Sequence, residues 1–270
     1  MMRMRSPRRS APLLGAALAG IMMLPTPAPA EPAPPQCTAS SGLVRFDRPL
    51  LRVAQRVAIG EAVKIVTIGS SSTSGAGASS IASNYPSRLE VELKARFPRL
   101  PIQVLNRGVG GEEVPQMLAR FAEAVLAEKP DLVIWQVGTN SVLRGHDIRK
   151  VAEDIREGLG RLKAMGTDVI LMDLQFAPRV IDRADAEPMV SLIATAAKRD
   201  NVDLFRRFAL MRDWSEAGHI SFRQSLAPDG LHMNDWSYGC MAKLLASAIA
   251  DAATRVPQTA GISAAPTTQR

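Results

Sequence analysis

The sequence predicts an α/β fold, a three-layer α/β/α sandwich around a central parallel sheet. Short runs rich in Val and Ile alternate with longer segments of helical periodicity from residue 63 to about residue 250, and Gly or Pro often separates them. Strands that alternate with helices of this length pair in parallel and carry helices on both faces of the sheet. The chain has 270 residues, 46% of them hydrophobic, which is enough for one such domain.

Five apolar runs are the predicted strands. The first is Val63–Ile68, and it ends in a turn of glycine and serine. Pro130 and Gly166 precede the third and fourth runs, as expected where a helix stops and the chain enters a strand. The later four runs are residues 102–105, 131–137, 169–174 and, more weakly, 202–205.

Segments with helical spacing occupy the intervals between the strands. Leu89 and Leu93, for example, are four residues apart and share one face of a helix that begins near Pro86. The predicted helices cover residues 86–97, 114–126, 148–165, 184–198 and 235–250.

The first thirty residues have the pattern of a secretory signal peptide. Four arginines precede an apolar run at residues 13–24, and small residues follow at 28–30. Because the apolar run is too short to span a bilayer comfortably, we expect removal after export and no stable membrane span. The mature protein is then periplasmic or secreted.

The rest of the chain divides by composition. Proline and small residues dominate residues 31–42, which is typical of a linker. The predicted organisation is a signal peptide at 1–30, an N-terminal arm or linker at 31–60, a catalytic domain at 61–255 and a flexible tail at 256–270.

The charge of the chain excludes one class of partner. The sequence has 33 basic and 26 acidic residues, a net charge of +7, and the four leader arginines account for four of those charges, which leaves +3 (7 − 4). No stripe of basic and aromatic residues accompanies this small excess. We therefore expect no nucleic-acid partner, and the oligomeric state is left open.

The chain has only two cysteines, Cys37 and Cys240. In an oxidising compartment they are candidates for a disulfide that would pin the N-terminal arm to the domain. Two unrelated thiols are the alternative, and both interpretations stay open. With two Cys and three widely separated His there is no metal-binding pattern, so we expect no metal and no cofactor.

Four short polar segments, far apart in the sequence, supply the parts of a serine esterase site. They are residues 69–72 (Gly-Ser-Ser-Ser), 106–111 (Asn-Arg-Gly-Val-Gly-Gly), 138–140 (Gly-Thr-Asn) and 229–232 (Asp-Gly-Leu-His). The first three follow the first three predicted strands. Because ligands in such sheets bind beyond the carboxyl ends of the strands, these turns should converge on one crevice.

A serine becomes a useful nucleophile when an imidazole takes its proton, and a carboxylate orients that imidazole. Asp229 and His232 are three residues apart in a turn, which lets the carboxylate reach Nδ1 of the ring. His146 and His219 lack a carboxylate at such a spacing and are expected at the surface, although His219 could line the site if the preceding loop folds over it. We therefore expect His232 to be the general base.

The four segments, in this order, resemble the sequence blocks of the SGNH hydrolases, the GDSL-type lipases and esterases. That resemblance implies a flavodoxin-like SGNH hydrolase fold. It makes Ser71 the nucleophile, since Gly69 aligns with the glycine of Gly-Asp-Ser. It also implies an oxyanion hole built from the Ser71 backbone N–H, Gly111 and Asn140, with Asp229 and His232 as acid and base.

The chain departs from the family pattern at two positions. Ser70 stands in place of the aspartate of Gly-Asp-Ser, and Ser141 in place of the aspartate that commonly follows Gly-Thr-Asn. Neither position is a triad member, so catalysis should survive. Taken singly, Gly111 could merely permit a tight turn and Asn140 could merely cap a helix.

These residues predict a serine hydrolase that cleaves acyl or acetyl esters of a small molecule or glycan through an acyl-enzyme. Transfer of the acetyl group to an envelope polysaccharide, as an O-acetyltransferase, is one alternative. A non-catalytic ligand-binding module is the other, although Gly69 and Gly75 lack the Lys-Ser/Thr of a phosphate-binding P-loop.

Overall fold

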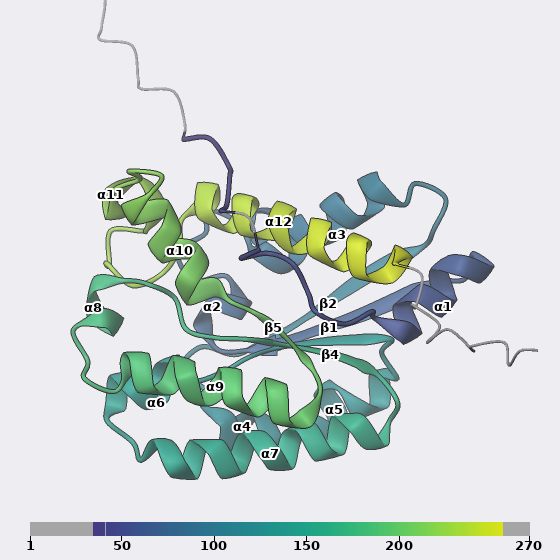
Figure 1. The fold of residues 1–270 in the computed structure, drawn as a ribbon, viewed down its shortest axis with the longest axis horizontal. Helices are drawn as coiled ribbons and strands as arrows, with labels where there is room; N and C mark the ends of the chain where they lie inside the picture. The colour runs from purple at the N-terminus through teal and green to yellow at the C-terminus, as the bar shows by residue number, and fades with distance from the viewer. Residues whose placement is uncertain (1–34, 41, 256–270) are drawn as a thin grey trace, which may run out of the picture. The chain divides into compact units, whose positions relative to one another are not determined.

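The computed structural model describes residues 35–40 and 42–255 (Figure 1). The predicted signal peptide at 1–30 and the predicted tail at 256–270 lie outside the described residues.

The described residues form a five-stranded, all-parallel sheet with helices on both faces, as predicted. The strand order is β2-β1-β3-β4-β5, the flavodoxin-like order, in which the direction of chain winding reverses between β1 and β3. All five predicted strands are present, with small shifts at their ends. They are β1 (Val63–Gly69), β2 (Ile102–Gly108), β3 (Leu132–Gln136), β4 (Asp168–Met172) and β5 (Asp203–Phe205).

Helices cover each face of the sheet (Figure 1). One face carries α1 (Leu51–Ile59), α3 (Tyr85–Arg96) and α12 (Asp235–Thr254), and α12 packs against both of the others. The opposite face carries α4 (Val114–Ala119), α7 (Ile148–Ala164) and α9 (Ala186–Asp200), with α7 packed between α4 and α9. Since the sheet is covered on both sides, its central side chains, such as Ile65, Ile68 and Trp135, are fully buried.

The remaining helices connect these layers. Several of them follow a strand and so lie beyond the carboxyl end of the sheet, on the left in Figure 1. They are α2 (Ser71–Ser74), η1 (Ile81–Ser83), α5 (Phe121–Ala124), η2 (Leu126–Glu128), α6 (Thr139–Arg144), α8 (Pro178–Ile181), α10 (Arg207–Glu216) and α11 (Phe222–Ser225).

The sequence did not predict α10 or the short elements α2, η1, α6, α8 and α11, and two further segments differ from the sequence-based expectation. The predicted helix at 114–126 is broken at Arg120, whose φ is −110°, because the Arg120 guanidinium turns back to bond Glu112 and the carbonyl of Arg107. Within the expected arm at 31–60, residues 51–59 form helix α1, which packs on α12 through buried residues such as Val53. That part of the stretch therefore belongs to the folded domain.

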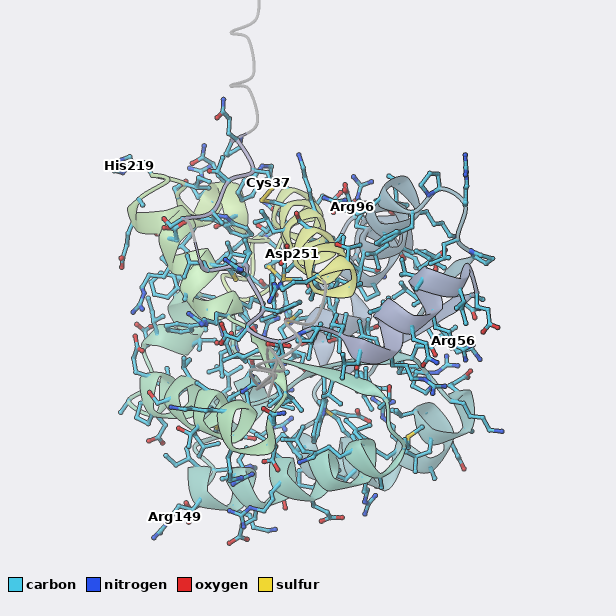
Figure 2. The ribbon with its side chains drawn as sticks, turned by 45° about the vertical axis from the view of Figure 1, so that its right-hand side comes forward. Cys37, Arg56, Arg96, Arg149, His219 and Asp251 are labelled. Carbon is cyan, nitrogen blue, oxygen red and sulfur yellow. A yellow bond between two sulfur atoms is a disulfide. The ribbon has the colours of Figure 1, made fainter. Side chains whose placement is uncertain are left out.

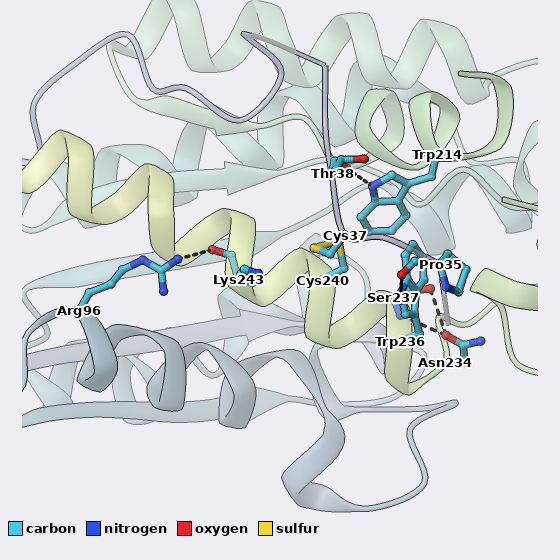
Figure 3. Close-up of a disulfide and its surroundings, with 10 residues drawn as sticks. All are labelled: Pro35, Cys37, Thr38, Arg96, Trp214, Asn234, Trp236, Ser237, Cys240 and Lys243. Carbon is cyan, nitrogen blue, oxygen red and sulfur yellow. Dashed lines mark hydrogen bonds between the residues drawn. A yellow bond between two sulfur atoms is a disulfide. The ribbon is translucent and has the colours of Figure 1, made fainter. Parts of the chain in front are cut away.

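The segment before α1 is fastened to the last helices (Figure 3). Cys37 and Cys240 form a disulfide that joins this segment to α12. On either side of it, the indole N–H of Trp214 donates to the Thr38 carbonyl at 2.9 Å, and that of Trp236 donates to the Pro35 carbonyl at 2.8 Å.

Candidate active site

The turn after β1 presents Ser71 as the first residue of α2. Its neighbour Ser70 is buried and faces inward, where both its backbone N–H and its hydroxyl donate to Gln136 Oε1, at 2.9 and 3.0 Å. Gln136 is the last residue of the adjacent strand β3. Ser70 thus anchors the turn that carries Ser71 to the centre of the sheet.

Ser71, His232 and Asp229 form one hydrogen-bonded chain. His232 Nε2 lies 2.8 Å from Ser71 Oγ, and His232 Nδ1 lies 2.5 Å from Asp229 Oδ2. The other oxygen of Asp229 accepts the backbone N–H groups of Leu231 and His232, each at 3.0 Å. Both carboxylate oxygens are therefore occupied, and the ring is fixed in the orientation that directs Nε2 at the serine.

The electrostatics of Asp229 follow from these contacts. Partial burial would raise its pKa, but the side-chain bond with His232 and the two backbone N–H donors outweigh it, so the pKa lies below its ordinary value. The carboxylate is therefore ionised at neutral pH, the form that stabilises an imidazolium.

The loop that carries His232 is docked against the segment after α2. Gly77 has φ of +87°, and a Cβ there would lie 2.8 Å from the His232 Cβ, so a side chain at this position would push the two loops apart. Nearby, the Tyr238 hydroxyl donates to the Ala76 carbonyl at 2.7 Å. These contacts connect α12 to the nucleophile turn and hold the imidazole beside Ser71.

The second and third turns border the same edge of the sheet. The N–H of Val109 donates to the Gly69 carbonyl at 3.0 Å, which places the second turn beside the start of the nucleophile turn. Asn140 Nδ2 donates to the Glu112 carbonyl at 2.8 Å, which ties the third turn to the second. Gly111 has φ of +81°, a conformation that favours glycine. Among the residues described, the N–H groups of Ser71 and Gly111 donate to no protein acceptor.

The other predicted candidates lie elsewhere. His219 is exposed at the edge of the molecule (Figure 2), as expected for a surface histidine. His146 is also exposed and bonds to Glu113, with 2.7 Å between Nδ1 and Oε2. Neither ring bonds to Ser71.

Two sets of contacts at this edge of the sheet were not predicted from the sequence. Gln136 holds the turn that carries Ser71, and Glu113 bonds to Ser141, Arg144 and His146. Both belong to segments without a recognisable motif, and the partners of Glu113 lie about thirty positions further along the chain. The one local feature that could have pointed to Glu113 is the pair of glutamates that directly follows Gly110-Gly111.

Within residues 35–40 and 42–255, no group of three His, Cys, Asp or Glu side chains is arranged to hold a metal ion. No helix in this same part of the chain is both long and apolar enough to cross a membrane.

A parallel sheet of order 2-1-3-4-5, a serine after β1 and an Asp-x-x-His loop before the last helix define the SGNH class of hydrolase folds, in agreement with the resemblance seen in the sequence. The model of the non-GDSL lipase-like family matches residues 36–255, and the chain belongs to that family. The family description agrees with Ser70, which replaces the aspartate of the Gly-Asp-Ser block.

Two curated relatives are esterases. An acetylxylan esterase from Geobacillus stearothermophilus is 35% identical over 98 residues, which cover 33% of this chain and 45% of the relative. An arylesterase from Vibrio mimicus is 26% identical over 77 residues, which cover 28% of this chain and 38% of the relative. The matched segments thus span less than half the length of either relative.

Solved structures of esterases share the fold. A two-domain esterase active on acetylated mannans, crystallised with mannopentaose, has a TM-score of 0.66 at 22% identity, over 78% of this chain and 56% of that one. The structure of an acetylxylan esterase from Geobacillus stearothermophilus has a TM-score of 0.58 at 22% identity, over 71% of this chain and 95% of that one. The three-layer architecture is common to these proteins.

Proposed function

We propose that the protein hydrolyses carboxylic esters through an acyl-enzyme on Ser71. The observation that carries this proposal is the continuous hydrogen-bonded chain from Asp229 through His232 to Ser71. The family membership and the esterase relatives support the same class of reaction.

In the proposed reaction, Ser71 Oγ attacks the ester carbonyl while His232 Nε2 accepts the hydroxyl proton. Asp229 stabilises the imidazolium that forms, and His232 then protonates the departing alcohol oxygen. A water molecule attacks the acyl-serine with the same base, which releases the carboxylic acid and restores Ser71. The protons balance over the two half-reactions.

Negative charge on the carbonyl oxygen would be stabilised by the backbone N–H groups of Ser71 and Gly111 and by the Asn140 carboxamide. Three features support this role: Ser71 and Gly111 have N–H groups without a protein acceptor among the described residues, Gly111 has a positive φ, and the third turn is tied to the second. One hydrogen of the Asn140 amide bonds to Glu112, which leaves the second for an oxyanion.

We propose acetyl esters of a glycan as the substrate class. This finer assignment draws on the relatives, one named an acetylxylan esterase and another structure described as active on acetylated mannans. An acetyl group is small, so selectivity for it would appear as a fall in turnover as the acyl chain lengthens.

We also propose that the protein is exported. The N-terminal pattern has the composition of a signal peptide, and the Cys37–Cys240 disulfide is of the kind that persists in an oxidising compartment.

The test is hydrolysis of p-nitrophenyl esters from acetate to octanoate by the purified protein, with Ser71→Ala and Ser72→Ala measured in parallel. Ser72 is the matched control because it is the adjacent serine of the same helix and is buried. We expect turnover that is highest with acetate, is lost in Ser71→Ala and persists in Ser72→Ala. Loss of turnover in Ser72→Ala but not in Ser71→Ala would contradict the assignment of the nucleophile.

Product analysis separates hydrolysis from transfer. With acetylated xylan or mannan as donor, the proposal predicts free acetate as the product whether or not a second, unacetylated glycan is present. Acetylation of the added glycan at the expense of free acetate would instead identify an acetyltransferase.

A further inference from the structure

We propose that Glu113 is a positioning residue, which holds the Gly111 and Asn140 turns in register through one buried carboxylate. This inference rests on the proposed function, since the two turns would supply the oxyanion donors.

The Glu113 side chain collects donors from two separate elements. Oε2 accepts the Ser141 hydroxyl at 2.8 Å and lies 2.7 Å from His146 Nδ1, and Oε1 accepts from the Arg144 guanidinium. Glu113 is also the N-cap residue of helix α4, where its backbone N–H donates to the Gln116 side chain at 3.1 Å. With 8% of its surface exposed, Glu113 is a buried acid whose oxygens all have partners.

These contacts favour the charged carboxylate. Burial raises the pKa of Glu113, but the bonds from Ser141, Arg144 and His146 outweigh it and bring the pKa below its ordinary value. An ionised acceptor makes stronger hydrogen bonds than a neutral one, so the linkage is strongest in the charged state.

The main chain beside Glu113 also accepts hydrogen bonds from side chains of α6. Arg144 Nη2 donates to the Gly111 carbonyl at 2.9 Å, and Asn140 Nδ2 donates to the Glu112 carbonyl at 2.8 Å. Three consecutive residues, Gly111, Glu112 and Glu113, thus accept from side chains of α6, which are those of Asn140, Ser141 and Arg144. Because the carboxylate bonds both to Ser141 and to Arg144, its loss would free the residue next to Asn140 and the side chain that fixes Gly111.

The substitution at position 141 fits this arrangement. The family resemblance places an aspartate there, whereas this chain has a serine that donates its hydroxyl to Glu113. Two carboxylates at this separation would repel each other.

A polar residue at position 113 could serve only as the N-cap of α4. The variant Glu113→Ser separates this capping role from the role of linking the two turns. Serine is a favourable N-cap, so α4 keeps its cap, but the short side chain loses the bonds to Ser141, Arg144 and His146. Asp131→Asn is the matched control, because Asp131 is a buried carboxylate, 3% exposed, that bonds Arg52 and Arg56 at the opposite end of the sheet.

The experiment measures kcat and KM of Glu113→Ser with p-nitrophenyl acetate, in the wild-type and the Asn140→Ala backgrounds. Displacing an oxyanion donor weakens binding of the transition state but not of the substrate. We therefore expect kcat to fall about tenfold in the wild-type background, with KM changed less than about twofold. Because Glu113 acts partly through the Asn140 turn and partly through Gly111, the same change should still lower kcat in the Asn140→Ala background, but by only about threefold.

An unchanged kcat in Glu113→Ser, an equal loss in both backgrounds, or a loss matched by Asp131→Asn would overturn the positioning role. Failure of the proposed function is a different result, namely absence of Ser71-dependent turnover by the wild-type protein.

Discussion

At the scale of single residues, the site is defined by which serine faces the imidazole. Four serines crowd the first turn, and the sequence alone could not rank them without a family alignment. The structure separates them by their partners: Ser70 bonds Gln136, Ser74 bonds the Ser71 carbonyl, and Ser71 bonds His232. Long-range contacts of this kind depend on the packing of distant segments, which no local pattern encodes.

The Asn140 side chain should affect the transition state more than the substrate. Removing one oxyanion donor in Asn140→Ala is expected to lower kcat about a hundredfold, with a much smaller change in KM. Steady-state kinetics with p-nitrophenyl acetate measure both constants. A variant that raises KM alone would show that Asn140 binds the ground state instead.

Ionisation of Glu113 predicts a pH-dependent stability. A carboxyl group whose pKa is lowered on folding stabilises the protein above its unfolded pKa, and that contribution is lost as the pH falls through the lower folded value. The difference in Tm between wild type and Glu113→Gln should therefore be constant above the ordinary pKa of 4.5 and should close below it. Thermal unfolding from about pH 3 to about pH 8 measures this difference. A difference in Tm that increases toward acid pH would contradict a lowered pKa of Glu113 in the folded protein.

At the scale of elements, the strands were predictable because each is a short segment dominated by apolar residues, whereas several helices were not predicted. Helix α10 was not predicted, although its buried Phe208, Met211 and Trp214 recur every three residues; its first buried position is the charged Arg207. Helix α1 does have apolar residues four apart, Val53 and Val57, and the expected arm was drawn too far along the chain. The break at Arg120 depends on a side chain that reaches back to the second turn, so periodicity alone missed it.

The disulfide predicts a stability effect that is separate from catalysis. Cys37 and Cys240 are 203 residues apart, and the chain-entropy model assigns up to about 5 kcal/mol to a loop of that length. We expect Cys37→Ser/Cys240→Ser to unfold about 10 °C lower than wild type while its kcat at room temperature changes less than about twofold.

Calorimetry of wild type with and without a reductant is the control for this variant, since reduction should reproduce the shift in Tm. If the double variant had a lower kcat at an unchanged Tm, the disulfide would act on the active site rather than on the stability of the fold.

At the scale of the whole molecule, the sheet order explains why four distant segments meet. The winding reverses between β1 and β3, so the turns that follow these two strands lie at the same edge of the sheet, and β2 places a third turn beside that of β1. The fold class and the convergence of these turns could therefore be predicted from the alternation of elements. The buried carboxylate that links two of the turns could not, because its partners come together only after folding.

The central claim is that Ser71 is the nucleophile activated by His232. Mass spectrometry of the protein after treatment with a fluorophosphonate tests it most directly, because the reagent captures a serine only when its hydroxyl is activated. We predict a single adduct, mapped to Ser71, that is absent in Ser71→Ala and forms far more slowly in His232→Ala. Labelling of another serine, or no labelling of folded wild-type protein, would contradict this account.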